Sequence, residues 1–151
     1  MSAGAAQAWF VAGTIPLIVA GAVHVLYALV DTVAPRYFAP VESSVKPAME
    51  GTTIRLRRGS PRGDQTKPSM WAVWLGVNIG FGIGLLGFGL MCLLIAAHDF
   101  ALVTSIAAIR PLTIAICAAY VVVSMRFFYY LQVIITGTAL ACFGVAAVLS
   151  A

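Results

Sequence analysis

Two polar side chains interrupt apolar stretches of this sequence at positions that could form one chemical site. His24 lies six residues before the end of the stretch 8–30, and Asn78 lies eight residues after the start of the uncharged stretch 70–97. If both stretches are membrane-spanning helices, a rise of 1.5 Å per residue places these residues about 9 Å and about 12 Å from the same membrane face. An imidazole and an amide at comparable depth could bind a proton, a small ligand or a lipid headgroup.

Two further polar residues fall at a similar depth on the other apolar stretches. Tyr120 lies five residues before Met125, and Thr136 lies five residues after Leu131. Four helices could therefore contribute to one polar layer. Polar groups inside a bilayer are costly and often functional, but they also hydrogen-bond neighbouring helices to one another. Both interpretations stay open, a ligand site around this layer or simple interhelical hydrogen bonding.

The apolar stretches that carry these residues predict the fold class. Of the 151 residues, 62% are hydrophobic and 9% are charged, which is unlike a soluble domain. A helix needs about 20 mostly apolar residues to cross a hydrocarbon core of roughly 30 Å. We predict an all-α membrane protein with a single domain, a four-transmembrane-helix bundle. Its spans are expected at about 8–30, 70–97, 102–125 and 131–150, with one long loop at 31–69.

The first apolar stretch begins close to the N-terminus and could be either a signal peptide or a membrane-spanning helix. Residues 1–7 carry no positive charge, so we expect the first stretch to be a retained helix and not a signal peptide.

The start of the third span depends on Pro111, which would suit the first turn of a helix. In that case residues 101–109 form a short re-entrant or interfacial segment, and the third span begins at Arg110.

The basic residues predict the orientation in the membrane, because Lys and Arg in short loops are kept on the cytoplasmic side. Eight of the nine fall on one face, in the loop 31–69 and at Arg126, and only Arg110 falls on the other. We expect a multi-pass membrane protein. The loop 31–69 is expected to be cytoplasmic, with both termini on the non-cytoplasmic side.

Basic and aromatic residues gather where the spans meet the cytoplasmic face. Tryptophan prefers the headgroup level, and juxtamembrane basic clusters attract anionic lipids. The residues expected at this interface are Arg55, Arg57, Arg58, Arg126, Trp71 and Trp74. The segment RLRRGSPR (55–62) could instead contact nucleic acid, but a lipid headgroup is the commoner partner of such a cluster. We therefore predict the lipid bilayer and its anionic headgroups as partners, and no nucleic acid.

Two carboxylates near the ends of the spans have basic neighbours. Asp31 closes the first stretch and could pair with Arg36 or Arg126. On the other face, Asp99 could pair with Arg110 across the turn that precedes the third span. Near water such a pair contributes only about 0–1 kcal/mol.

The sequence gives little support for a metal, a cofactor or a catalytic constellation. The three cysteines, Cys92, Cys117 and Cys142, lie one on each of the last three stretches, without the spacing of a zinc site. A heme held by His24 and His98 would need ligands from opposite membrane faces. No cofactor and no metal are predicted, and these features favour a non-enzymatic chain while a membrane enzyme stays open as the alternative.

The stretch GVNIGFGIGLLGFG (76–89) contains the letters G-x-G-x-x-G of a dinucleotide-binding loop. That loop needs a preceding strand and a helix start in water, so the match inside an apolar helix is accidental. At 100° per residue, Gly76, Gly80, Gly84 and Gly87 share an arc of about 80°. Asn78, Gly82 and Gly89 share an arc of about 40° on the opposite side. Such small-residue grooves let helices approach closely, so we predict a helix that is close-packed on both faces.

The motifs around these residues resemble a family of small, uncharacterised bacterial proteins with four transmembrane helices. The resemblance is carried by His24, Asp31, Pro35-Arg36, Phe38 and the block MWAVWLGVNIGFGIGLLGFGL. The family pattern W-x-x-W-x-G-x-N is matched by Trp71, Trp74, Gly76 and Asn78, and the first three positions of the pattern R-[FY]-F-F by Arg126–Phe128. Members often have Ser-His after the Asn, where this chain has Gly80-Phe81. The resemblance implies a four-helix fold and a compartment, the bacterial inner membrane, but no reaction.

Two functions are compatible with these features. The first is a non-enzymatic structural or accessory subunit that packs through its glycine-rich second span into a homo-oligomer or a larger membrane complex. The alternative is a small transporter or membrane enzyme that handles a lipid, a quinone or another small molecule at the layer around His24 and Asn78. Substitution of the polar layer should abolish the function of a transporter or enzyme. Enlargement of Gly80 or Gly84 should instead abolish the function of a subunit.

Overall fold

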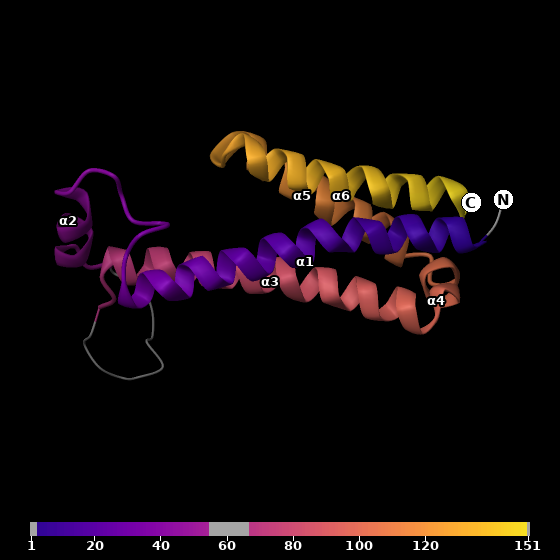
Figure 1. Cartoon of the computed structure of the whole chain (residues 1–151), viewed down its shortest axis with the longest axis horizontal. Coiled ribbons are helices and arrows are strands. Elements are labelled where there is room, and N and C mark those ends of the chain that lie inside the picture. The colour runs from indigo at the N-terminus through magenta and orange to yellow at the C-terminus, as the bar shows by residue number, and fades with distance from the viewer. Residues whose placement is uncertain (1–2, 55–66, 151) are drawn as a thin grey trace. The chain divides into compact units, whose positions relative to one another are not determined.

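The computed structural model describes residues 3–54 and 67–150, and nearly all of them lie in helices (Figure 1). The six helices within these ranges are α1 (Ala3–Val33), α2 (Val45–Gly51), α3 (Met70–His98), α4 (Phe100–Ser105), α5 (Ile109–Phe127) and α6 (Tyr130–Leu149).

Four of these helices are long and apolar enough to cross a membrane. The candidate spans are Gly4–Val33, Met70–His98, Ile109–Phe127 and Tyr130–Leu149. The all-helical fold class is thereby confirmed, and the helices indicate a multi-pass membrane protein. The third span begins at Ile109 and not near residue 102, because the short helix α4 precedes it. Pro111 accordingly lies in the first turn of α5, where its missing N–H leaves no helix hydrogen bond unmade.

The chain forms two compact units, and α1 and α3 each contribute to both. The first unit comprises Met1–Ala22 and Gly84–Ala151, and the second comprises Val23–Ile83. Each unit is described separately below.

An aromatic cluster forms the centre of the first unit. The ring of Phe10 on α1 lies 4.9 Å from that of Phe143 on α6 and 6.0 Å from that of Phe100 on α4, both in edge-on geometry. Gly13, one turn after Phe10, allows this approach, because a Cβ there would lie 3.1 Å from Cys142 and Phe143. α5 and α6 pack against each other as a hairpin. A small residue and three rings thus bring α1, α4 and α6 together.

Polar side chains close the helix ends of the first unit. Asp99 is the N-cap of α4, and its carboxylate accepts a hydrogen bond from the N–H of Ala101 at 2.9 Å. Arg110 donates from Nη1 to the carbonyl oxygen and the hydroxyl of Ser150, at 2.9 and 3.1 Å, and thereby caps the end of α6. The expected Asp99–Arg110 ion pair is wrong, since each side chain is engaged by the end of a helix.

The second unit contains the end of α1, the connection to α3 and the first half of α3. In the described part of the connection, residues 34–54 and 67–69, the prolines prevent a long helix and the seven-residue α2 is the helix that forms. Thr53 and Ser69 form an antiparallel bridge that brings the two sides of the connection together just before α3. Residues 55–66 lie outside the described residues, and with them the expected headgroup contacts of Arg55, Arg57 and Arg58.

Candidate functional site

His24 and Asn78 meet in the second unit. Nε2 of His24 on α1 lies 3.1 Å from Oδ1 of Asn78 on α3. The amide nitrogen of Asn78 donates to the carbonyl oxygen of Trp74, one turn earlier, at 2.8 Å. With its nitrogen occupied, the amide turns its oxygen to the imidazole, so Nε2 must carry the hydrogen. In the neutral imidazole the lone pair then resides on Nδ1.

Two phenylalanine rings enclose the imidazole. The ring centroid of Phe38 lies 4.7 Å from that of His24, and the centroid of Phe81 lies 5.1 Å from it. His24 is half-buried and Asn78 is 5% exposed. Phe81 follows Asn78 by three residues and shares its side of the helix, which the sequence could have revealed. Phe38 belongs to the connection after α1, and no periodicity marks it.

Asp31 lies near this enclosure, but it binds backbone and not an arginine side chain. Its Oδ1 accepts from the N–H of Arg36 at 2.7 Å and of Tyr37 at 2.9 Å, and its Oδ2 accepts from the N–H of Phe38 at 2.6 Å. The residue has no exposed surface. The guanidinium of Arg36 lies instead over the ring of Tyr37, 5.8 Å from its centroid. The expected ion pair is therefore wrong, because backbone N–H groups occupy the carboxylate.

The two tryptophans at the start of α3 differ in their surroundings. Trp74 is 42% exposed, and its Nε1 donates to the carbonyl oxygen of Phe38 at 3.1 Å. Trp71 is 8% exposed, and the ammonium of Lys46 lies 5.4 Å from the centroid of its ring system. We expect both tryptophans at the headgroup level of the membrane. Of the two, Trp74 has the exposed ring that such a position needs, whereas the ring of Trp71 is buried.

The other two residues of the expected polar layer belong to the first unit. Thr136 on α6 is fully buried, and its hydroxyl donates to the carbonyl oxygen of Gln132 at 2.9 Å. Tyr120 on α5 has its hydroxyl oxygen 3.8 Å from the place of a Cβ on Gly84. The structure therefore joins His24 to Asn78, while the four-residue layer stays a prediction.

The two glycine arcs of α3 have different surroundings. On the arc of Asn78, Gly82 and Gly89, all three residues are buried. On the other arc all four glycines are exposed. Within the described chain, a Cβ on Gly76, Gly80 or Gly87 would meet no atom within 4 Å. Within the described residues, only the hydroxyl of Tyr120 comes within 4 Å of a Cβ placed on this arc, at Gly84, so close packing along the rest of the arc stays a prediction that needs another molecule.

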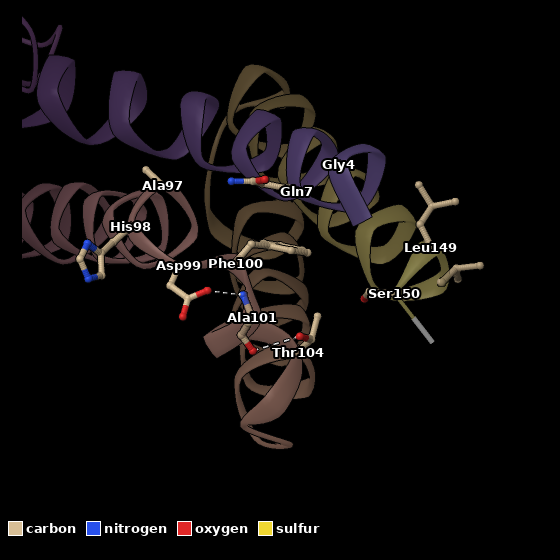
Figure 2. Close-up of a pocket in the computed structure, with 11 residues that line it drawn as sticks. Gly4, Gln7, Ala97, His98, Asp99, Phe100, Ala101, Thr104, Leu149 and Ser150 are labelled. Atoms are coloured by element: carbon tan, nitrogen blue, oxygen red, sulfur yellow. Dashed lines mark hydrogen bonds between the residues drawn. The ribbon is translucent and has the colours of Figure 1, made fainter. Parts of the chain in front are cut away.

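A depression of about 800 Å³ lies at one end of the first unit, between the start of α1, the turn from α3 to α4 and the end of α6 (Figure 2). Its polar side chains mainly serve backbone groups. Gln7 donates from Nε2 to the carbonyl oxygen of Ala96, and Thr104 donates to that of Ala101. The His98 side chain extends away from Gln7 (Figure 2). No set of side chains converges here as it does around His24.

Within residues 3–54 and 67–150, no group of three His, Cys, Asp or Glu side chains is close enough to hold a metal ion. Cys92, Cys117 and Cys142 are buried free thiols. Comparisons of the chain with protein-family models, with curated proteins and with solved structures find no match. The family resemblance therefore stays an expectation, and the site is interpreted from its geometry.

Proposed function

We propose that this protein is a non-enzymatic subunit that packs through α3 into a homo-oligomer or a larger membrane complex. The observation that carries the proposal is the exposed glycine arc of Gly76, Gly80, Gly84 and Gly87. A face of this length without side chains exposes backbone to the surroundings, and nothing in the described chain covers it near Gly76, Gly80 or Gly87.

The physics of helix association in lipid supports this assignment. Lipid tails are as apolar as the helix surface, so helices associate mainly by close van der Waals packing and interhelical hydrogen bonds. Small residues spaced by four permit such approach. Larger side chains border the arc, with Val77 61% exposed and Ile83 57% exposed. A partner helix would lie between these two borders, directly over the glycines.

The proposed setting is the bacterial inner membrane, with the connection between α1 and α3 in the cytoplasm and both termini outside it. Support comes from the basic residues, eight of which fall on the side of that connection. Anionic headgroups are the proposed partners of this side. In the last turn of α5, the guanidinium of Arg126 lies 5.3 Å from the centroid of the Phe127 ring, and Tyr129 after the helix is exposed.

Site-specific photo-crosslinking in the membrane tests the proposal without presuming the partner. A photoreactive phenylalanine analogue at Val77 or Ile83 should form a crosslink to a second copy or to a companion protein. The same analogue at Val19 of α1, which is 56% exposed, provides the control. A crosslinking pattern in which Val77 and Ile83 give no more product than Val19 would contradict the proposal.

A second candidate function rests on one specific observation. Among the described residues, Nδ1 of His24 has no hydrogen-bond partner, although Nε2 is held by Asn78. A fixed imidazole with one available nitrogen could bind a lipid, a quinone or another small molecule. A ligand that co-purifies with the protein and is lost in His24→Ala would favour this candidate, whereas its retention would count against it.

A further inference from the structure

Residues 35–39, here called the strap, leave the end of α1 and return towards α3. Asp31 holds the first part of the strap. Its two carboxylate oxygens accept hydrogen bonds from three consecutive backbone N–H groups, those of Arg36, Tyr37 and Phe38. A short run of N–H groups that point to one anion fixes the backbone conformation of the run, since all of them must face the same point. Burial of the carboxylate strengthens these bonds.

Trp74 holds the strap from the other side. Its indole N–H donates to the carbonyl oxygen of Phe38 at 3.1 Å. Phe38 is therefore bound at its N–H by a side chain of α1 and at its carbonyl by a side chain of α3. A residue fixed at both backbone groups has little freedom to move its side chain away.

The side chain positioned in this way is the ring that lies against His24. Its centroid is 4.7 Å from the imidazole centroid, with the planes tilted by 52°. The stacked rings of Tyr27 and Tyr37, 4.0 Å apart and 4° from parallel, add a further contact between α1 and the strap. We infer that the strap is a cover for His24, and that Asp31 and Trp74 are the positioning residues that keep it closed.

This inference goes beyond the proposed function and does not depend on it. In the closed state Phe38 and Phe81 lie against the imidazole and Asn78 binds Nε2. Release of the strap removes the contact of Phe38 with the imidazole. His24 is then exposed towards the connection between α1 and α3. The exposure of His24 is then set by the two anchors.

Chemical modification of the two histidines of the intact protein in detergent measures this exposure directly. Diethyl pyrocarbonate ethoxycarbonylates accessible unprotonated imidazoles, and His98, which is exposed, serves as an internal reference. The readout is the rate at His24 divided by the rate at His98, followed by peptide mass spectrometry. Asp31→Asn and Trp74→Phe should each raise this ratio, by about tenfold for the loss of the charged acceptor and less for the loss of a neutral bond.

Matched variants separate the strap from general loosening. Asp99→Asn makes the same change at the cap of α4, and Trp9→Phe makes the same change at a tryptophan that is 44% exposed. Both should leave the ratio unchanged. Phe38→Ala removes the cover without altering either anchor and should raise the ratio even if Asp31→Asn does not fold. An unchanged ratio in both Phe38→Ala and Trp74→Phe would overturn the inference.

Discussion

Gly89 of α3 lies so close to Ile18 of α1 that a Cβ at position 89 would stand 2.8 Å from Cγ1 of Ile18 and 3.2 Å from its backbone nitrogen. A Cβ at Gly80, on the opposite arc of the same helix, would meet no atom of the described chain within 4 Å. The packing of α1 against α3 therefore requires a glycine at position 89, whereas no contact in the described chain requires one at position 80.

The first prediction concerns these two glycines. Gly89→Ala should destabilise the folded chain by about 1–3 kcal/mol, because the added methyl must displace the backbone of α1. Gly80→Ala, the matched control, should leave the stability of the dissociated chain unchanged or raise it by up to about 1 kcal/mol, since alanine is the better helix former. Unfolding by SDS titration in mixed micelles measures both. A Gly89→Ala variant as stable as the Gly80→Ala variant would show that α1 and α3 are not in this contact.

The second prediction concerns the pair His24 and Asn78. Their hydrogen bond should give a coupling free energy of about 0.6 kcal/mol, with about 1.7 kcal/mol as the upper end for side-chain bonds between membrane helices. A double-mutant cycle of His24→Ala and Asn78→Ala in the same unfolding assay measures it. Strict additivity of the two single variants would mean that the bond contributes nothing to stability.

The third prediction concerns the end of α6. Arg110→Gln should accelerate amide hydrogen exchange in the last turn of α6, because the variant loses the cationic partner of the Ser150 carbonyl oxygen. The loss should correspond to about 1 kcal/mol of local stability. Arg126→Gln at the other end of α5 is the control and should leave that turn unchanged. Equal exchange in both variants would count against the cap.

Orientation gives a fourth prediction. A C-terminal alkaline phosphatase fusion should be active and a C-terminal fluorescent-protein fusion dark, since phosphatase folds outside the cytoplasm and fluorescent protein inside it. Moving the charge bias with Arg126→Glu should reduce the phosphatase signal. A bright fluorescent fusion with an inactive phosphatase would reverse the proposed topology.

The spans could be predicted from the sequence because hydrophobic length alone defines them. The helical period also divides the glycines into two arcs, since it depends only on 100° per residue, and the two arcs differ in burial. It could not tell which arc the chain would cover, because that depends on the side chains of α1 that α3 meets, such as Ile18. The start of the third span is within reach of the sequence, because Pro111 suits the first turn of a helix and α5 begins at Ile109, one residue before the expected Arg110.

The surroundings of His24 show a different limit. Asn78 could be matched to His24 from depth alone, and their hydrogen bond is present. Phe38 could not be foreseen, because its place depends on Asp31 binding backbone N–H groups. A carboxylate near arginines in the sequence predicts an ion pair. The sequence does not show whether the guanidinium or the backbone N–H of Arg36 binds the carboxylate of Asp31.

Native mass spectrometry of the intact protein, extracted in mild detergent, distinguishes a subunit of an assembly from a chain that acts alone. We expect the wild-type chain to be released as an oligomer or with a companion protein. Gly80→Ile, at a position where a Cβ meets no atom of the described chain within 4 Å, should yield a folded monomer. A wild-type monomer without any companion, or an assembly unchanged by Gly80→Ile, would contradict the account.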